Sequence, residues 1–433
     1  MTRLSLLLSG TVLSVALAAA PAFSQSGEET SPSEQAEGQA PASGEERTAT
    51  GAPVETEEPN APDQQPAFAG QTRAPQPDEM PQVATETIAE GLPRLWSMEF
   101  LPDGRMLVSA KEGAMHIISE GQAGPEIAGV PEVASQGQGG LLDIALAPDF
   151  ESSGRIFFSF SEPRDGGNGT SVASARLVQD EQGGGALEDV TVIFRQMPTY
   201  DGSAHFGSRL VFGPGGELFV TVGERSDRRP RVQAQDLSSG LGKVFRIDTS
   251  GKALSDNPFA GRDGALPEIW SYGHRNIQSA ALDGQGRLWT VEHGPRGGDE
   301  LNRPEAGLNY GWPVITYGVE YSGNAVGDGV TAQDGMEQPV YYWDPVIGPS
   351  GMAYYDGAEF PEWNGAFLIG GLVSTGLVVV HLDGDRVRAE ERVPLDMRIR
   401  DVKVGPDGAV YAVSEGPNAG TSSILRLTNA SDS

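Results

Sequence analysis

Apolar and polar positions along the chain repeat as one unit, in which a short apolar run, a tight turn and an alternating run follow one another. In the first unit, residues 98–108, the turn is Pro102-Asp103-Gly104. Pro and Gly supply the backbone angles of a turn, and alternation places apolar side chains on one face, so this unit predicts a β-hairpin. Five related units follow, at residues 144–158, 210–222, 281–291, 352–369 and 402–413.

Six hairpins along one chain predict an all-β fold. The units are spaced by roughly 45 to 70 residues, a little wider than the usual propeller repeat. The residues beyond the usual repeat length are expected in loops. Almost no stretch shows helical periodicity over two turns, and Gly is abundant, with 58 residues. We therefore predict a six-bladed β-propeller over residues 83–430, in which loops at one face converge on a central channel where ligands bind.

The first 82 residues follow a different pattern. Arg3 precedes an apolar run over residues 4–20 and small residues near position 24, which is typical of a cleaved signal peptide over residues 1–24. Residues 25–82 are rich in Glu, Gln, Pro, Ala, Gly and Ser and almost free of branched apolar residues. Such a segment buries too little surface to offset the entropy of ordering, so a disordered acidic linker is expected there.

Charge and cysteine content narrow the classes of protein. The sequence of 433 residues has no Cys, which excludes a lipoprotein anchor, disulfides and thiolate metal sites. Export without disulfides is typical of a periplasmic protein with a large core. A formal net charge of −30 argues against nucleic acid or an anionic membrane as a partner.

One histidine is a candidate for a catalytic base. His205 lies in the loop directly before the third hairpin, so its side chain is expected at a blade edge. Neutral imidazole titrates near physiological pH and can accept a proton from an alcohol. The local sequence leaves open a purely structural role, in which the side chain hydrogen-bonds a turn. His116 and His381 lie inside apolar strands, where a structural role is expected.

Three further segments combine charged and amide side chains with Gly and Pro turns. They are residues 271–276, with sequence SYGHRN, residues 292–302, with sequence EHGPRGGDELN, and residues 309–313, with sequence NYGWP. Such segments suit loops at one end of a rigid β scaffold that bind an anionic or metal-bound ligand.

Together with residues 137–150 and 205–210, these segments resemble the soluble PQQ-dependent aldose sugar dehydrogenases. That family belongs with the soluble glucose dehydrogenases, which are six-bladed propellers. The resemblance covers residues 92–427 and rests on the order and spacing of five motifs. It implies an enzyme, a periplasmic quinoprotein that oxidises the anomeric hydroxyl of aldose sugars to lactones by general-base-assisted hydride transfer to PQQ.

The resemblance also implies roles for individual residues. His205 matches the base that takes the proton of the sugar hydroxyl. Arg275 and Asn276 match the pair that binds the quinone carbonyl region, where a guanidinium would stabilise the negative charge that builds as hydride arrives. The other cofactor contacts implied are Gln138, Leu372, Arg398, Arg400 and Tyr321.

Two calcium ions are implied in the same way. The cofactor calcium would be held by main-chain carbonyls of Gly294 and Pro295 together with PQQ atoms. A second, structural calcium would use Glu300 and the main-chain oxygen of Tyr310. Ca²⁺ prefers such oxygen ligands and can act as a Lewis acid on the quinone.

The sequence departs from this family at two positions. Val373 stands where members commonly carry a Lys that contacts the cofactor, and loss of a charged hydrogen bond costs about 1.5–3 kcal/mol. Ala204 stands where the glucose dehydrogenases have an acid that could orient the base. A weaker cofactor site and a differently tuned base are therefore expected.

Two other functions remain open at this point. A calcium-dependent propeller lactonase or esterase would need several carboxylate and Asn side chains around one metal in the channel, whereas Arg275, Arg398 and Arg400 suit an anionic cofactor better. A non-catalytic propeller binding module is kept open by the missing Lys. For the dehydrogenase, the expected partners are an aldose sugar and an electron acceptor of unknown identity, and the expected state is a monomer or a homodimer.

Overall fold

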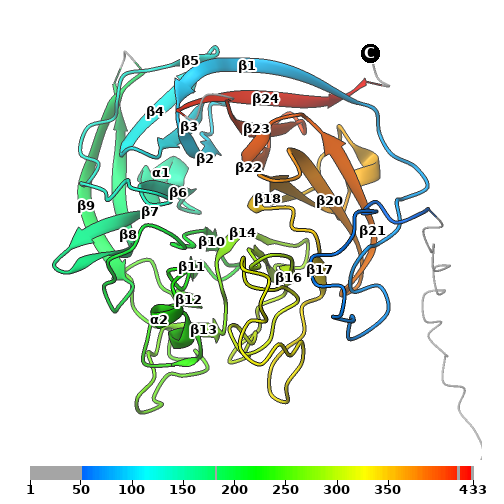
Figure 1. Ribbon diagram of the computed structural model, residues 1–433. Coiled ribbons are helices and arrows are strands. Elements are labelled where there is room, and N and C mark those ends of the chain that lie inside the picture. The colour runs from blue at the N-terminus through cyan, green and yellow to red at the C-terminus, as the bar shows by residue number, and fades with distance from the viewer. Residues whose placement is uncertain (1–50, 181–182, 417–419, 431–433) are drawn as a thin grey trace, which may run out of the picture. The chain divides into compact units, whose positions relative to one another are not determined.

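The computed structural model describes residues 51–180, 183–416 and 420–430, and these residues form a six-bladed β-propeller (Figure 1). The predicted signal peptide and residues 25–50 of the predicted linker lie outside the described residues. Six four-stranded antiparallel sheets make the blades. The all-β six-bladed fold predicted from the hairpin pattern is thus confirmed.

Five blades are meanders of four consecutive strands. The first has β2 (Leu95–Phe100), β3 (Met106–Ala110), β4 (Ala114–Ser119) and β5 (Gln122–Ala123). The second has β6 (Leu141–Leu146), β7 (Arg155–Arg164), β8 (Gly167–Gln179) and β9 (Gly185–Arg195). The third has β10 (Leu210–Phe212), β11 (Leu218–Val222), β12 (Lys243–Ile247) and β13 (Ile269–Tyr272). The fourth has β14 (Ile277–Leu282), β15 (Leu288–Glu292), β16 (Asp299–Asn302) and β17 (Tyr341–Trp343). The fifth has β18 (Pro349–Tyr354), β19 (Phe367–Gly371), β20 (Gly376–Asp383) and β21 (Arg386–Pro394).

The sixth blade joins the two ends of the propeller. Its strands are β22 (Arg398–Val404), β23 (Val410–Glu415), β24 (Thr421–Asn429) and, from the other end, β1 (Val83–Pro93). Strand β1 pairs antiparallel with β24 from Val83 opposite Asn429 to Pro93 opposite Thr421, and Figure 1 shows the two strands side by side. The ring is therefore closed by hydrogen bonds between the first and last strands.

Each predicted hairpin forms the first two strands of a blade. In the first, Phe100 pairs with Met106 across the Pro-Asp-Gly turn. The short helices α1 (Phe150–Ser153), α2 (Arg228–Arg231), η1 (Val232–Gln235) and η2 (Pro361–Trp363) lie in connections. Among the described residues, no helix has the length and apolar character needed to cross a membrane.

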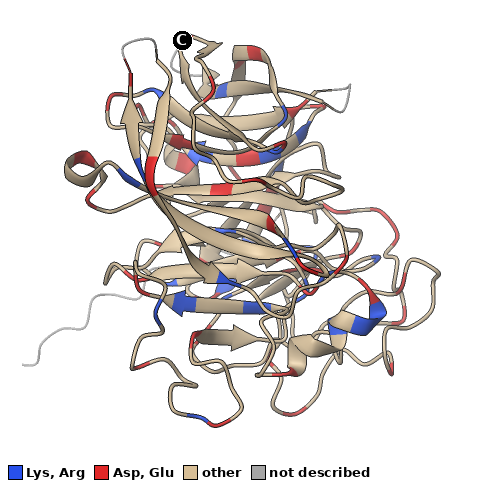
Figure 2. Ribbon diagram, turned by 90° about the vertical axis from the view of Figure 1, so that its left-hand side faces the viewer, with Lys and Arg blue, Asp and Glu red and all other residues tan. Residues whose placement is uncertain are grey.

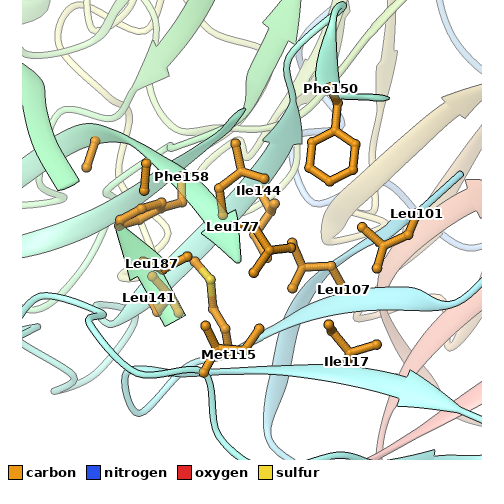
Figure 3. Close-up of a cluster of buried hydrophobic side chains, with 14 of the residues drawn as sticks. Leu101, Leu107, Met115, Ile117, Leu141, Ile144, Phe150, Phe158, Leu177 and Leu187 are labelled. Carbon is orange, nitrogen blue, oxygen red and sulfur yellow. The ribbon is translucent and has the colours of Figure 1, made fainter. Parts of the chain in front are cut away.

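The core lies between neighbouring blades. Leu107 and Ile117 of the first blade pack with Ile144 and Phe158 of the second, all of them nearly inaccessible to solvent (Figure 3). Burying one such side chain contributes about 1.5–3 kcal/mol. Figure 2 shows acidic and basic residues intermixed on the blades of the side in view. The blades are thus held face to face by apolar contacts.

The first strands of the blades line the centre of the ring, where one cation joins several of them. Arg209, next to β10, is buried and forms ion pairs with Asp143 of β6 at 2.9 Å and Asp401 of β22 at 3.0 Å. Its Nε donates to the carbonyl of Gln278 in β14 at 2.8 Å, and its guanidinium lies 4.3 Å from the ring of Trp96 in β2. One side chain thus contacts the inner strands of four other blades.

Residues 51–82, which we call the N-terminal strap, differ from the expected disordered linker. The strap lies beside β17 and β21 (Figure 1). The Asp344 carboxylate accepts hydrogen bonds from the backbone amides of Asn60 and Ala61 at 2.8 and 2.9 Å. Gln71 is fully buried, and its carbonyl accepts from the amide of Tyr342 at 2.9 Å. The expectation of a disordered linker does not hold for these residues, because they make hydrogen bonds to the propeller and bury Ala61 and Ala74.

Replacing Asp344 by Ala should loosen the N-terminal strap. The amides of Asn60 and Ala61 would lose their acceptor, and an unsatisfied buried polar group costs about 1–3 kcal/mol. We expect faster limited proteolysis within residues 51–82 and a lower midpoint of urea unfolding. Asp328→Ala, at an exposed loop position, is the matched control. Equal cleavage rates for D344A and the unmodified protein would show that Asp344 does not hold the strap.

Candidate active site

A cavity lies where loops meet the beginnings of the inner strands. Its walls come from the segments at the starts of β2, β6, β14 and β22 and from the residues that follow β3, β15 and β19. We call it the main cavity. It is lined by Arg94, Trp96, Lys111, Gly137, Gln138, Asn276, Gln278, His293, Leu372, Arg398 and Arg400.

A smaller cavity adjoins the main cavity, and His293 lines both. We call it the side cavity. It is lined by Arg275, Glu292, His293, Gly294, Gly298, Glu300, Tyr310, Trp312, Ile315 and Thr316. The two cavities bring together nine of the residues singled out from the sequence. Gln138, Asn276, Leu372, Arg398 and Arg400 line the main cavity, and Arg275, Gly294, Glu300 and Tyr310 line the side cavity.

His205 lies behind this site as a buried side chain that is 6% exposed. Its amide donates to Oε1 of Gln138 at 2.7 Å, which joins it to the wall of the main cavity. The backbone has φ of 52°, a left-handed conformation that histidine tolerates better than most residues. Burial, and then the nearby Arg275 guanidinium, lower the pKa of His205. The imidazole is therefore neutral at pH 7 and able to accept a proton.

An acid that the sequence did not reveal stands beside this imidazole. Glu224, just after β11, has Oε1 at 3.3 Å from Nδ1 of His205 and is fully buried. The absence of an acid at Ala204 had suggested a base without an orienting carboxylate. The structure supplies one from a position 19 residues along the chain, because the loops after β11 and before β10 meet at the same end of the third blade.

Arg275 is held in place while its Nε donor has no partner among the described residues. Its Nη1 donates to the carbonyl of His293 at 2.8 Å, and its amide donates to the Glu292 carboxylate. Glu292 also lies 2.9 Å from Nδ1 of His274, which fixes the residue before Arg275. The Nε atom of Arg275 is buried and has no hydrogen-bond partner among the described residues. An unpaired buried donor is costly, so this atom is suited to a ligand in the side cavity.

A carboxylate shapes the loop that carries Gly294 and Pro295. Asp299 accepts from the amide of Gly294 at 2.8 Å through Oδ1 and from the amide of Gly348 at 2.8 Å through Oδ2. Pro295 is buried but is not among the residues that line either cavity. In the described part of the chain, no group of three or more His, Cys, Asp and Glu side chains is placed to hold a metal ion.

Glu300 is the acidic group at the predicted structural calcium position. It lines the side cavity together with Tyr310 and Glu292. Burial raises the pKa of Glu300 well above its ordinary value, and the neighbouring Glu292 adds to the effect. Negative charge at this point is therefore unfavourable unless a cation balances it.

Tyr321 is not brought to either cavity. It is 73% exposed and lies in the turn closed by the Gly323 amide and the Glu320 carbonyl at 2.7 Å. Val373, at the position of the expected Lys, is 57% exposed and also lines neither cavity. In contrast, Lys111 and His293 line the site although sequence reasoning gave them no role.

The family model described as "Glucose / Sorbosone dehydrogenase" matches residues 92–426, and the chain therefore belongs to this family. It is similar to the aldose sugar dehydrogenase YliI of Escherichia coli strain K12, with 43% identity over 343 residues that cover 77% of this chain and 90% of the relative. The family resemblance inferred from the motifs is confirmed.

Solved structures agree with this membership. The soluble aldose sugar dehydrogenase of Escherichia coli in the apo form has a TM-score of 0.75 and 40% identity, over 80% of this chain and 100% of that chain. The PQQ-bound aldose sugar dehydrogenase of Streptomyces coelicolor has a TM-score of 0.65 and 28% identity, with coverage of 80% and 100%.

Replacing Glu224 by Gln tests its contact with His205. The carboxylate raises the pKa of His205, so its loss should lower that pKa further. Histidine-labelled protein followed by NMR during an acid titration measures the shift directly, because the chain has only five histidines. Glu391→Gln is the matched control, since Glu391 faces His381 at 2.8 Å. An unchanged His205 titration in E224Q would contradict the pairing.

Proposed function

We propose that this protein is a PQQ-dependent oxidoreductase that converts the anomeric hydroxyl of an aldose sugar into the lactone. The proposal is supported by its family and by relatives whose names include aldose sugar dehydrogenase and a PQQ-bound form. The observation that carries it is a neutral, buried imidazole beside a cavity lined by cations.

The main cavity suits a flat, tricarboxylate cofactor. Four cationic side chains line it, namely Arg94, Lys111, Arg398 and Arg400, and its described lining includes no carboxylate. Trp96 and Leu372 add apolar surface to the walls. Guanidinium and ammonium groups bind carboxylates through charge-assisted hydrogen bonds. When bound there, PQQ supplies the quinone that accepts the two electrons and the hydrogen of the sugar.

His205 would act as the general base for the sugar hydroxyl. Because its Nδ1 faces Glu224, a proton on Nδ1 leaves Nε2 free to accept the proton of the hydroxyl. The imidazolium that forms would be stabilised by the Glu224 carboxylate. Arg275, with its free Nε, would offset negative charge that develops opposite the base.

Two calcium ions are proposed, one held by the main-chain oxygens of Gly294 and Pro295 together with the cofactor, and a second, structural ion held by Glu300 and the main-chain oxygen of Tyr310. The support for the second ion is electrostatic, because the carboxylates of Glu292 and Glu300 both accept from Nδ2 of Asn302, at 3.1 and 3.3 Å, and Glu292 adds to the rise in the pKa of Glu300. A bound divalent cation would remove their mutual repulsion and fix the loop that Asp299 shapes. The cofactor calcium would act as a Lewis acid on the quinone.

The two alternatives are less well supported. A lactonase or esterase of the propeller type would place a metal among carboxylate and amide side chains in the channel, whereas the main cavity presents cations. A binding module without chemistry is less well supported because the relatives are named as dehydrogenases.

We further propose that the protein is exported to the periplasm, since residues 1–24 have the pattern of a signal peptide. N-terminal sequencing of protein from a periplasmic extract tests this, and an N-terminus at Met1 would contradict it.

The decisive experiment adds PQQ and Ca²⁺ to purified apoprotein and follows dye reduction with a panel of aldoses. We expect turnover, and we expect His205→Gln to lower kcat by about 10²–10⁴-fold, the contribution of a general base. PQQ absorbance should show that H205Q still binds the cofactor. His116→Gln, in a strand away from the cavities, is the control. No turnover with any aldose by PQQ-loaded protein would refute the proposal.

Calcium dependence has its own test. Adding Ca²⁺ to chelator-treated protein should raise the melting temperature, because a ligand that binds only the folded state stabilises it. Glu300→Gln should reduce this gain. Glu126→Gln, at an exposed position, should keep it. A Ca²⁺-induced shift that is the same in E300Q would remove Glu300 from the metal site.

A further inference from the structure

The first blade contributes two cations to the main cavity that the sequence analysis did not assign. Arg94 directly precedes β2, and Lys111 directly follows β3. Their backbones are joined by a hydrogen bond from the Lys111 amide to the Arg94 carbonyl at 2.8 Å. Both side chains line the main cavity. The pair therefore forms one wall, on a different blade from Arg398 and Arg400.

The cations of the sixth blade already have a counter-ion. Arg398 binds Oε2 of Glu415 through Nε at 2.8 Å, and Arg400 binds Oε1 through its Nε at 2.9 Å. Their charges are partly balanced before any ligand arrives.

The cations of the first blade have no such partner. Nζ of Lys111 makes one hydrogen bond, to the carbonyl of Ser135 at 3.1 Å, and forms no ion pair within the described residues. The Arg94 guanidinium has neither an ion pair nor a hydrogen bond to any residue in the described ranges. Lys111 is only 6% exposed. A buried cation without a counter-ion is unfavourable, so its presence points to a negative group from outside the chain.

The loop opposite Lys111 is built to let this side chain reach the cavity. Gly140 has φ of 141°, and a Cβ there would lie 2.0 Å from the Lys111 carbonyl oxygen and 2.8 Å from its Cγ. Only glycine avoids this collision. The Leu141 amide also donates to the Lys111 carbonyl at 3.0 Å, which fixes the start of the side chain.

We propose that Lys111 and Arg94 form a carboxylate-binding subsite that holds one carboxylate of the cofactor from the side of the first blade. This inference rests on the proposed function, because it assumes that the anionic ligand is PQQ. The subsite also explains why a Lys is not needed at Val373, because the main cavity has an ammonium from Lys111 and position 373 lines neither cavity.

Cofactor titrations of the apoprotein in saturating Ca²⁺, followed by quenching of tryptophan fluorescence, test the subsite without any assay of turnover. Lys111→Met and Arg94→Gln should each raise the Kd for PQQ about 10–100-fold, the loss of one charge-assisted hydrogen bond. Lys111→Arg should keep most of the affinity. Lys252→Met, an exposed lysine in the turn after β12, should bind as the unmodified protein does.

Apoprotein stability separates this role from a structural one. If Lys111 serves a ligand, K111M should leave the melting temperature of the apoprotein unchanged or raise it, because an unpaired buried charge is removed. A markedly lower melting temperature of K111M apoprotein would indicate a structural role and overturn the subsite.

The pH dependence of cofactor affinity is a second signature. Burial, and then Arg94, lower the pKa of Lys111 to about 8, with Arg400 acting in the same direction and Glu112 and Glu415 opposing. The ammonium is thus present below pH 8 and is lost as the pH rises through it, so PQQ affinity should fall there. Arginine and glutamate side chains do not ordinarily titrate between pH 7 and 9, so this decline should vanish in K111R.

The possible outcomes separate the two proposals. If the unmodified protein fails to bind PQQ, the proposed function itself is wrong. If it binds PQQ and both K111M and R94Q match its affinity, the function stands and the subsite is wrong. Weaker binding confined to the two variants, with an intact apoprotein, is the result that supports the subsite.

Discussion

The buried guanidinium of Arg209 is the interaction on which the geometry of the site depends. It pairs with Asp143 and Asp401 and binds the carbonyl of Gln278, so it fixes β6, β22 and β14 relative to β10. Most walls of the main cavity are the beginnings of these strands or the loops that lead into them. Breaking a buried ion pair on one side typically costs 3–5 kcal/mol, because the other charge is left unbalanced. The contacts of Arg209 therefore position the walls of the main cavity as well as the inner strands.

The main cavity and the neighbouring His205 differ in charge, and this difference suits the proposed chemistry. The main cavity presents cations, whereas the His205 imidazole beside it is kept neutral by burial and by Arg275. Arg275 thus adds positive charge to the side cavity and also lowers the pKa of His205. Glu224 opposes this effect, because its carboxylate raises the pKa of His205. Loss of the Arg275 charge would raise the pKa of His205, whereas loss of the Glu224 charge would lower it.

The fold and much of the site could be predicted because both depend on local sequence. The turn Pro102-Asp103-Gly104 and its equivalents determine hairpins directly, and the motif loops carry most of the cavity residues. The features that were not predicted from the sequence depend on contacts between distant segments of the chain. No local sequence signal marks Glu224 or Lys111. The geometry of the blades places Glu224 beside His205 and Lys111 beside Arg94. The composition of residues 51–82 does not indicate that Asp344 holds the N-terminal strap. The sequence also does not indicate that Tyr321 lies in an exposed turn.

The pairing of β1 with β24 has a consequence for how the molecule is made. During synthesis, β1 leaves the ribosome more than three hundred residues before its partner, so the sixth blade cannot form until translation is nearly finished. Until then, two apolar blade faces and an unpaired strand edge remain open, the kind of surface on which nascent chains aggregate. The export proposed above would remove this waiting period, because a chain that crosses a membrane unfolded presents both strands at once.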